Sequence, residues 1–338
     1  MSKKKILFIG GSPNQTRMVH AVARHLESEA ECFFTPFYTD GILGRLQKHG
    51  WMDFCILGGQ LRTQTLDFLR EQGLPLDEGG RRGGYDLVVT TTDLLVQRNI
   101  RKTPLVLIQE GMTDPENILF HLVRAIHLPR YLAGTSTTGL SNAFDVFCVA
   151  SPGYRDLFVR KGVDPAKIAV TGIPNFDDAA SYLDNDFPHR HYVLAATSDC
   201  RETFRLDHRT KFVRWVLDIA AGRPVIFKLH PNEKADRATA EIYRLAPRAL
   251  VFSWGDTNHM IANSDVLIAQ YSSVVYIGLA LGKEVHSYFD PADLRRLLPL
   301  QNGGRSAANI ASVCRGILEN GGREAAGAAA WDMAVCWR

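Results

Sequence analysis

Two serines in this 338-residue chain stand where a buried strand is expected to end and a helix to begin. Ser272 and Ser273 follow the apolar run Val266 to Ile268 and precede an apolar, helix-like stretch. The first amides of a helix have no partner within it, its dipole is positive there, and serine hydroxyls add donors. The pattern predicts a phosphate or diphosphate site that includes Gln270 and Tyr271; the alternative is that Ser272 only caps the helix.

A histidine follows another predicted strand, in the segment Phe227 to Asn232. Ligands of open α/β sheets bind beyond the carboxyl ends of the strands, so we expect His230 and Asn232 at the same edge as the serines. An imidazole can donate a hydrogen bond to phosphate or transfer a proton near neutral pH. Pro231 is expected to begin the next helix. A lone histidine after a strand is more often structural, so its spacing from the serine turn carries the functional interpretation.

The amino-terminal segment Gly10-Gly11-Ser12 follows the first predicted strand and leads into the first helix. It matches neither GxGxxG nor a Walker loop. The two glycines would let the backbone approach a ligand, and Asn14 is expected to cap the helix. The segment is therefore a candidate second wall of the ligand site, although a plain tight turn explains it equally well.

Two carboxylates follow the buried run Leu105 to Gln109. Partial burial raises the pKa of a carboxyl group toward neutrality, which suits a general base facing an acceptor hydroxyl, and we assign that role to Glu110. The alternative is a solvated loop in which Asp114 caps a helix. The remaining histidines show no HExxH or paired-ligand spacing, so neither a metal nor a cofactor is predicted.

Composition excludes several function classes. With 39 lysines and arginines against 36 acidic residues, the net charge of +3 is too slight for a dedicated nucleic-acid binder. The six cysteines form no CxxC pair and are typical of reduced thiols. The apolar run after Met1 to Lys5 is shorter than a signal-peptide core, and no segment is long enough to span a membrane. We therefore expect a cytoplasmic protein.

Alternation of short β-branched runs with longer helical patterns predicts an α/β fold with doubly wound parallel sheets. The predicted strands are Lys5 to Ile9, Cys32 to Thr35, Phe54 to Leu57, Leu87 to Thr90, Leu105 to Gln109, Val146 to Ala150, Ile168 to Thr171, Tyr192 to Ala196, Val225 to Leu229, Ala249 to Phe252, Val266 to Ile268 and Glu284 to Tyr288. We expect an acceptor-side domain over residues 1–178, a nucleotide-donor domain over 179–322 that includes a helix at Ala307 to Leu318, and a closing helix over 323–338 that packs back.

Three segments in order resemble a known family. They are Val170 to Asp177 (Val-Thr-Gly-Ile-Pro-Asn-Phe-Asp), Lys228 to Pro231 (Lys-Leu-His-Pro), and Asp265 to Ser273 with Gly282 and Lys283 beyond. This order is similar to that of the CDP-glycerol glycerophosphotransferase (teichoic acid polymerase) family of the GT-B superfamily, over residues 165 to 290.

The resemblance implies two Rossmann-like domains that face a cleft, and a nucleotide-activated donor held largely by the second domain without an obligatory metal. In that reading His230 matches the histidine that contacts the donor phosphates, and Ser272 and Ser273 match the serine pair of the phosphate-binding helix. Gln270 departs from the family, which usually has aspartate there. The family's His-Gly-Thr-Pro motif is not found, and Gln109 to Met112 takes its place, so the acceptor-side base is either Glu110 or lost.

These observations favour a GT-B transferase that moves a sugar or polyol phosphate onto a glycan or lipid-linked acceptor of the cell surface. Non-hydrolysing UDP-N-acetylglucosamine 2-epimerases are a second resemblance through Thr171 to Pro174, but their Ser-Gly-Gly turn and paired glutamates do not occur. A third hypothesis is a nucleotide-sugar binding protein that has lost its base. Five basic residues would serve a peripheral membrane contact, or else are solvated surface: Arg81, Arg82, Arg98, Arg101 and Lys102.

Overall fold

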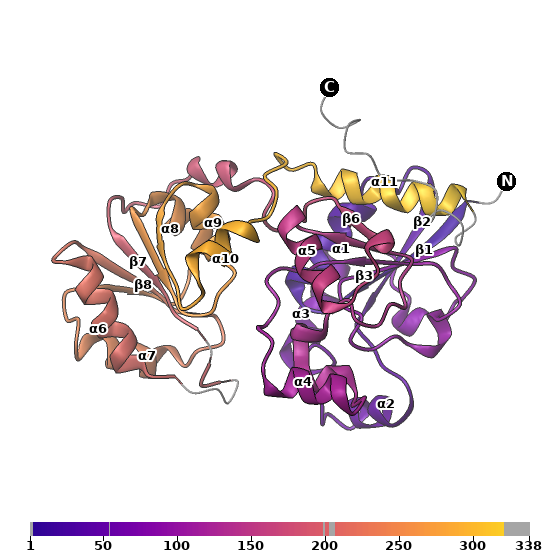
Figure 1. Cartoon of the computed structure of the whole chain (residues 1–338), viewed down its shortest axis with the longest axis horizontal. Helices are drawn as coiled ribbons and strands as arrows, with labels where there is room; N and C mark the ends of the chain where they lie inside the picture. Colours follow the sequence, from indigo (N-terminus) through magenta and orange to yellow (C-terminus); the bar gives the residue numbers. More distant parts are fainter. Residues whose placement is uncertain (1–2, 54, 199, 203–206, 321–338) are drawn as a thin grey trace. The chain divides into compact units, whose positions relative to one another are not determined.

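The chain forms two compact units. The computed structural model describes residues 3–53, 55–198, 200–202 and 207–320 (Figure 1). One unit contains the chain up to Asp177 together with the chain from Gly304 onward, and the other runs from Asp178 to Gly303. The expected closing helix at 323–338 lies outside the described residues.

A parallel sheet in the order β2-β1-β3-β4-β5-β6 forms the centre of the first unit. Three of its strands, β3 to β5, are buried along their whole length, because helices cover both faces of a doubly wound sheet and only apolar runs are stable there. The strands are β1 (Lys4–Gly10), β2 (Ala30–Pro36), β3 (Leu87–Thr90), β4 (Leu105–Ile108), β5 (Val146–Val149) and β6 (Ile168–Val170).

The described part of this unit contains six α-helices: α1 (Pro13–Ala23), α2 (Gly41–Lys48), α3 (Gly59–Glu71), α4 (Ile118–Ala125), α5 (Pro152–Lys161) and α11 (Ser306–Glu319). The last of these corrects the expected domain assignment. Helix α11 packs against α1 and β3, and Arg315 forms an ion pair with Glu29 at 2.9 Å. Its buried stripe, which includes Ile310, Val313 and Ile317, faces the first sheet, so the chain returns to its first unit after building the second.

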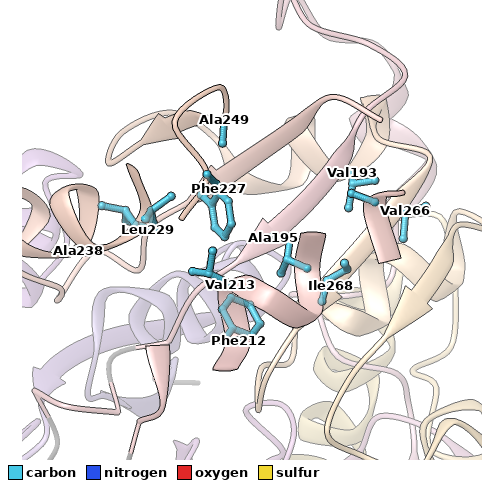
Figure 2. Close-up of a cluster of buried hydrophobic side chains, with 14 residues drawn as sticks. Val193, Ala195, Phe212, Val213, Phe227, Leu229, Ala238, Ala249, Val266 and Ile268 are labelled. Carbon is cyan, nitrogen blue, oxygen red and sulfur yellow. The ribbon is translucent and has the colours of Figure 1, made fainter. Parts of the chain in front are cut away.

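The second unit contains a parallel five-stranded sheet in the order β11-β10-β7-β8-β9. Figure 2 shows its core, where Phe212 and Val213 of one helix pack with Ala195, Phe227 and Ile268 of three strands. The strands are β7 (Val193–Ala196), β8 (Val225–Lys228), β9 (Leu250–Phe252), β10 (Val266–Ala269) and β11 (Glu284–His286); the helices are α6 (Arg209–Ala220), α7 (Ala235–Tyr243), α8 (Thr257–Asn263), α9 (Val275–Ala280) and α10 (Pro291–Arg296).

The α/β class and the two doubly wound sheets are confirmed, and eleven of the twelve predicted strands coincide with observed ones. The prediction of a strand at Phe54 to Leu57 is wrong for Cys55, Ile56 and Leu57, which form turns. The Oδ1 of Asp53 accepts the amide of Gly59 at 2.9 Å, so these residues connect two helices. Helices α2 and α10 were not predicted.

Candidate functional site

The strand order of the second unit brings three chemically important segments to one edge. Strand β7 lies between β10 and β8, so Ser198, Gln270 and His230 follow three neighbouring strands. Strands in a sheet are about 4.8 Å apart, which places the residues after β10 and β8 about 10 Å from one another. Side chains extending from both ends can reach one diphosphate-sized ligand.

The turn that carries the serine pair presents open donors. Ser272 and Ser273 are both partly exposed, and neither amide donates to a protein acceptor within the described chain. The hydroxyl of Ser272 lies 3.5 Å from the amide of Val274, at the limit of a hydrogen bond, so it is not engaged in strong capping. The exposed donors needed for an anion are therefore present on this turn.

The helix behind this turn is shorter than expected. Helix α9 spans only six residues, and the amides of Val275 and Tyr276 donate back to the carbonyls of Ser272 and Ser273 at 3.4 and 3.0 Å. The amides of Ser272 and Ser273 therefore belong to the turn that precedes α9, and not to the first turn of the helix as the sequence suggested. Tyr271 is 54% exposed and packs edge-on against the rings of Tyr288 and Phe289.

His230 is half-buried and has a defined tautomer in its neutral form. The amide of Asn232 donates to His230 Nδ1 at 3.2 Å. Because an amide N–H can only donate, Nδ1 accepts and Nε2 carries the proton in the neutral ring. The ring thus presents a donor suited to a phosphate oxygen. Pro231 does not begin a helix as expected: it lies in a turn, and α7 starts at Ala235.

Side chains of Thr197 and Glu233 fix the backbone at His230 through hydrogen bonds. Its amide donates to Glu233 Oε2 at 3.0 Å and to Thr197 Oγ1 at 3.1 Å, and Thr197 also bonds to Glu233. Arg209, the first residue of α6, pairs with Glu233 and lies 3.4 Å from Asp207. The side chains of these three charged residues are at most 4% exposed, so they form an ionic support beneath the histidine turn.

Gln270 belongs to the same support, and its role in donor binding stays a prediction. It is 5% exposed, its Oε1 accepts from Ser198 Oγ at 2.7 Å, and its Nε2 donates to Asp207 Oδ1 at 3.2 Å. An aspartate or glutamate at position 270 would direct a carboxylate toward Asp207. Glutamine in place of the aspartate usual in the resembling family therefore suits the neighbouring Asp207, a residue that the sequence analysis did not single out.

The glycine segment of the first unit has a structural explanation. A Cβ at Gly10 would collide with the side chain of Thr16, and one at Gly11 with that of Gln15. Ser12, and not Asn14, caps α1: its Oγ accepts the amide of Gln15 at 3.2 Å, and Gln15 Oε1 accepts the amide of Ser12 at 3.0 Å. The glycines thus make room for a capping box.

The same glutamine brings Glu110 to this segment. Gln15 Nε2 donates to Glu110 Oε2 at 2.6 Å, and Asn175 Nδ2 donates to the Glu110 carbonyl at 3.2 Å. Burial raises the pKa of Glu110, and the hydrogen bond from Gln15 opposes that rise. Gln15 and Asn175 were not predicted as site residues. Asp114 does not cap α4, because Asn117 accepts the amide of Phe120. The structure thus groups Ser12, Gln15 and Glu110 at one edge of the first sheet.

We expect Glu110→Gln to raise the melting temperature at pH 7. The raised pKa means that the folded chain retains this proton after the unfolded chain has lost it, so stability falls as pH rises from the ordinary glutamate pKa to the raised one. The amide removes this loss and can still accept from Gln15. The expected gain is a few degrees, since about 1 kcal/mol shifts Tm by about 2–4 °C in chains of this size. Thermal melts between pH 4 and 8 test it; equal melting temperatures at pH 7 would contradict it.

No group of three or more His, Cys, Asp or Glu side chains positioned to hold a metal occurs among the described residues. Within the same residues, no helix is both long and apolar enough to cross a bilayer.

Comparison with known proteins establishes the fold. No family model and no curated protein matches the chain. A UDP-GlcNAc 2-epimerase from Neisseria meningitidis, bound to UDP-GlcNAc, is 12% identical with a TM-score of 0.56, over 92% of this chain and 99% of that one. A Methanocaldococcus jannaschii UDP-GlcNAc 2-epimerase, in complex with UDP-GlcNAc and UDP, gives 12% and 0.55, over 92% and 100%. A variant of the wall teichoic acid polymerase TagF with CDPG gives 11% and 0.51, over 94% and 90%. The chain therefore has the fold of GT-B enzymes, built from two Rossmann-like units.

Proposed function

We propose that this protein is a GT-B transferase that moves a sugar or polyol phosphate from a nucleotide-activated donor to a glycan or polymer precursor of the cell surface. The observation that carries the proposal is the set of open donors at one edge of the second sheet. Among the described residues, the amides of Ser272 and Ser273 donate to no protein acceptor, and the His230 ring, protonated on Nε2 in its neutral form, follows a nearby strand. Such a set suits a diphosphate.

The chemistry follows from where charge develops. When the bond between the transferred group and the nucleotide breaks, negative charge grows on the departing phosphate. Amide and hydroxyl donors that are already oriented stabilise that charge without reorganising, and an imidazole N–H adds a further donor or a proton. Glu233 and Arg209 keep the histidine turn in place, and Asn232 keeps the donor tautomer.

The acceptor side is assigned to the first unit. Glu110, whose pKa is raised by burial, is the proposed base that removes a proton from the acceptor hydroxyl. Gln15 orients its carboxylate, and Ser12 with Gly10 and Gly11 forms the adjoining turn. We place the reaction in the cytoplasm, where nucleotide-activated donors would be its partners. Structures of similar fold are described with UDP-GlcNAc, UDP or CDPG, which supports a nucleotide-activated substrate class.

A UDP-N-acetylglucosamine 2-epimerase is the second candidate, favoured by the TM-score of 0.56 and the 99% coverage of the Neisseria meningitidis enzyme. Epimerisation needs acid and base groups at the sugar carbon. Helix α9 carries no carboxylate in its sequence Val-Tyr-Ile-Gly-Leu-Ala, which favours transfer. A third candidate, a binding protein without turnover, shares the donor site and differs only in lacking a working base.

Donor turnover separates the three candidates. The full chain is incubated with CDP-, UDP- and GDP-activated sugars and polyols, with and without glycan acceptors, and donor consumption is followed by chromatography. A transferase consumes one donor faster when an acceptor is present, by at least about tenfold, and Glu110→Gln abolishes the gain. An epimerase converts UDP-N-acetylglucosamine alone to its C2-inverted isomer. Donor binding without consumption across the acceptor panel would contradict the transferase proposal.

A further inference from the structure

Helix α4 of the first unit has an apolar face that no described part of the chain covers. Its inner side chains, Phe120 and Val123, pack with Ala133 into a small core. The opposite face carries Ile118, which is 88% exposed, and Ile126, which is 58% exposed. The neighbouring exposed apolar residues of α4 and the segment after it are Leu119, Leu122, Tyr131 and Leu132. An apolar surface of this size on a water-facing helix points to an interaction site.

Helix α2 adds a second apolar surface with positive charge. Ile42 is 76% exposed and Trp51, just beyond the helix, is 72% exposed. Arg45 and Lys48 are also exposed, and the sequence has no acidic residue from 41 to 52. Lysine and arginine beside exposed tryptophan and isoleucine are typical of segments that lie in the interface of an anionic bilayer.

The two helices belong to the same end of the first unit. Helix α2 follows the carboxyl end of β2, and α4 follows the carboxyl end of β4, so both lie beyond one edge of a parallel sheet. Figure 1 shows them at the lower end of this unit, opposite α11. Arg124 on α4 is exposed as well, with its guanidinium 5.6 Å from the Phe120 ring, which leaves a cation at the border of the apolar face.

We propose that α2 and α4 form a docking surface for an anionic lipid bilayer. Apolar side chains would enter the boundary between headgroups and acyl chains, and Arg45, Lys48 and Arg124 would meet the anionic headgroups. The inference rests on these two helices and requires no assumption about the reaction. The membrane contact expected from sequence at Arg81, Arg82, Arg98, Arg101 and Lys102 stays a separate prediction; of these, Arg98 is paired with Asp40 and the guanidinium of Arg82 lies over Phe33.

The test is co-sedimentation of the full chain with vesicles of phosphatidylcholine alone and of phosphatidylcholine with phosphatidylglycerol at 7:3. We expect binding to the anionic vesicles to exceed binding to the neutral ones by at least about tenfold, and to weaken as salt screens the charges. Ile118→Glu with Leu122→Glu removes apolar contact, and Arg45→Glu with Lys48→Glu removes charge. Each pair should reduce anionic binding by at least about tenfold.

Matched controls come from the second unit. Leu183→Glu changes an apolar residue that is 54% exposed, and Arg244→Glu with Arg248→Glu reverses two exposed cations; both should leave vesicle binding unchanged. Circular dichroism verifies that each variant folds. Three results would overturn the proposal: equal binding to both vesicle types, full binding by the α2 and α4 variants, or a dimer of the wild type that Ile118→Glu with Leu122→Glu converts to monomer. Nucleotide-induced thermal shifts report on the donor site separately.

Discussion

Replacing His230 with alanine is expected to lower donor turnover by about 10²- to 10³-fold while the protein stays folded. Loss of one preorganised donor or proton-transfer group from a site where charge develops typically has an effect of this size. The residue is half-buried and its ring accepts the amide of Asn232 two residues away, a local contact, so the fold should tolerate the change. Steady-state turnover with the donor identified in the panel above measures it.

A matched variant separates hydrogen bonding by His230 from proton transfer. His230→Gln keeps an N–H donor of similar reach, so it should recover about tenfold of the lost turnover if hydrogen bonding dominates. If proton transfer dominates, glutamine should be as poor as alanine, because an amide does not titrate near neutral pH. Wild-type turnover in His230→Ala would exclude His230 from the site.

Arg209→Met is expected to destabilise the protein by about 3–5 kcal/mol. The change leaves Glu233 buried without this cation, whereas Asp207 keeps Arg201 at 3.2 Å, and removing one partner of a buried ion pair has a cost of this order. Because Glu233 also accepts the amide of His230, the turn beneath the histidine should loosen as well. Urea unfolding followed by circular dichroism gives the free energy of unfolding.

An exposed ion pair provides the comparison for this variant. Arg296 pairs with Asp293 at 2.9 Å, but their side chains are 40% and 63% exposed. Arg296→Met should therefore change the unfolding free energy by less than about 1 kcal/mol. A combined Arg209→Met and Glu233→Gln variant should recover part of the loss, because it removes the stranded charge. Equal, small effects of Arg209→Met and Arg296→Met would show that the buried cluster does not support the turn.

The strands could be predicted because their signal is local. Runs such as Leu105 to Ile108 are apolar on both faces, and only a sheet covered on both sides by helices stabilises them. The segment at Cys55 to Leu57 has similar composition, but turn geometry beside Asp53 overrides it. The sequence placed helix α11 in the wrong domain. Its apolar stripe predicts that the helix packs against a sheet, but the stripe does not specify which of the two sheets.

In the candidate site too, residues at strand ends could be predicted from the sequence, whereas residues that pair across the fold could not. Ser272, Ser273 and His230 could be found because each follows a predicted strand, and strand ends of a parallel sheet share an edge. Gln270 gives no local sign that its amide is shared between Ser198 and Asp207. Arg209 and Glu233 are 24 residues apart, so their pairing depends on how α6 and the turn after β8 pack. Thr197 and Ser198 could also have been predicted from the sequence, since both follow the central strand β7.

The proposed function depends on the binding of a diphosphate by the serine turn of the second unit. Isothermal titration of the wild type and of Ser272→Ala with Ser273→Ala, using CDP, UDP and GDP, tests it directly. Because a hydrogen bond to a charged group contributes about 1.5–3 kcal/mol, we expect binding of at least one diphosphate and a Kd at least about tenfold weaker in the variant. Equal affinity in the two proteins, or no binding of any diphosphate to the wild type, would contradict it.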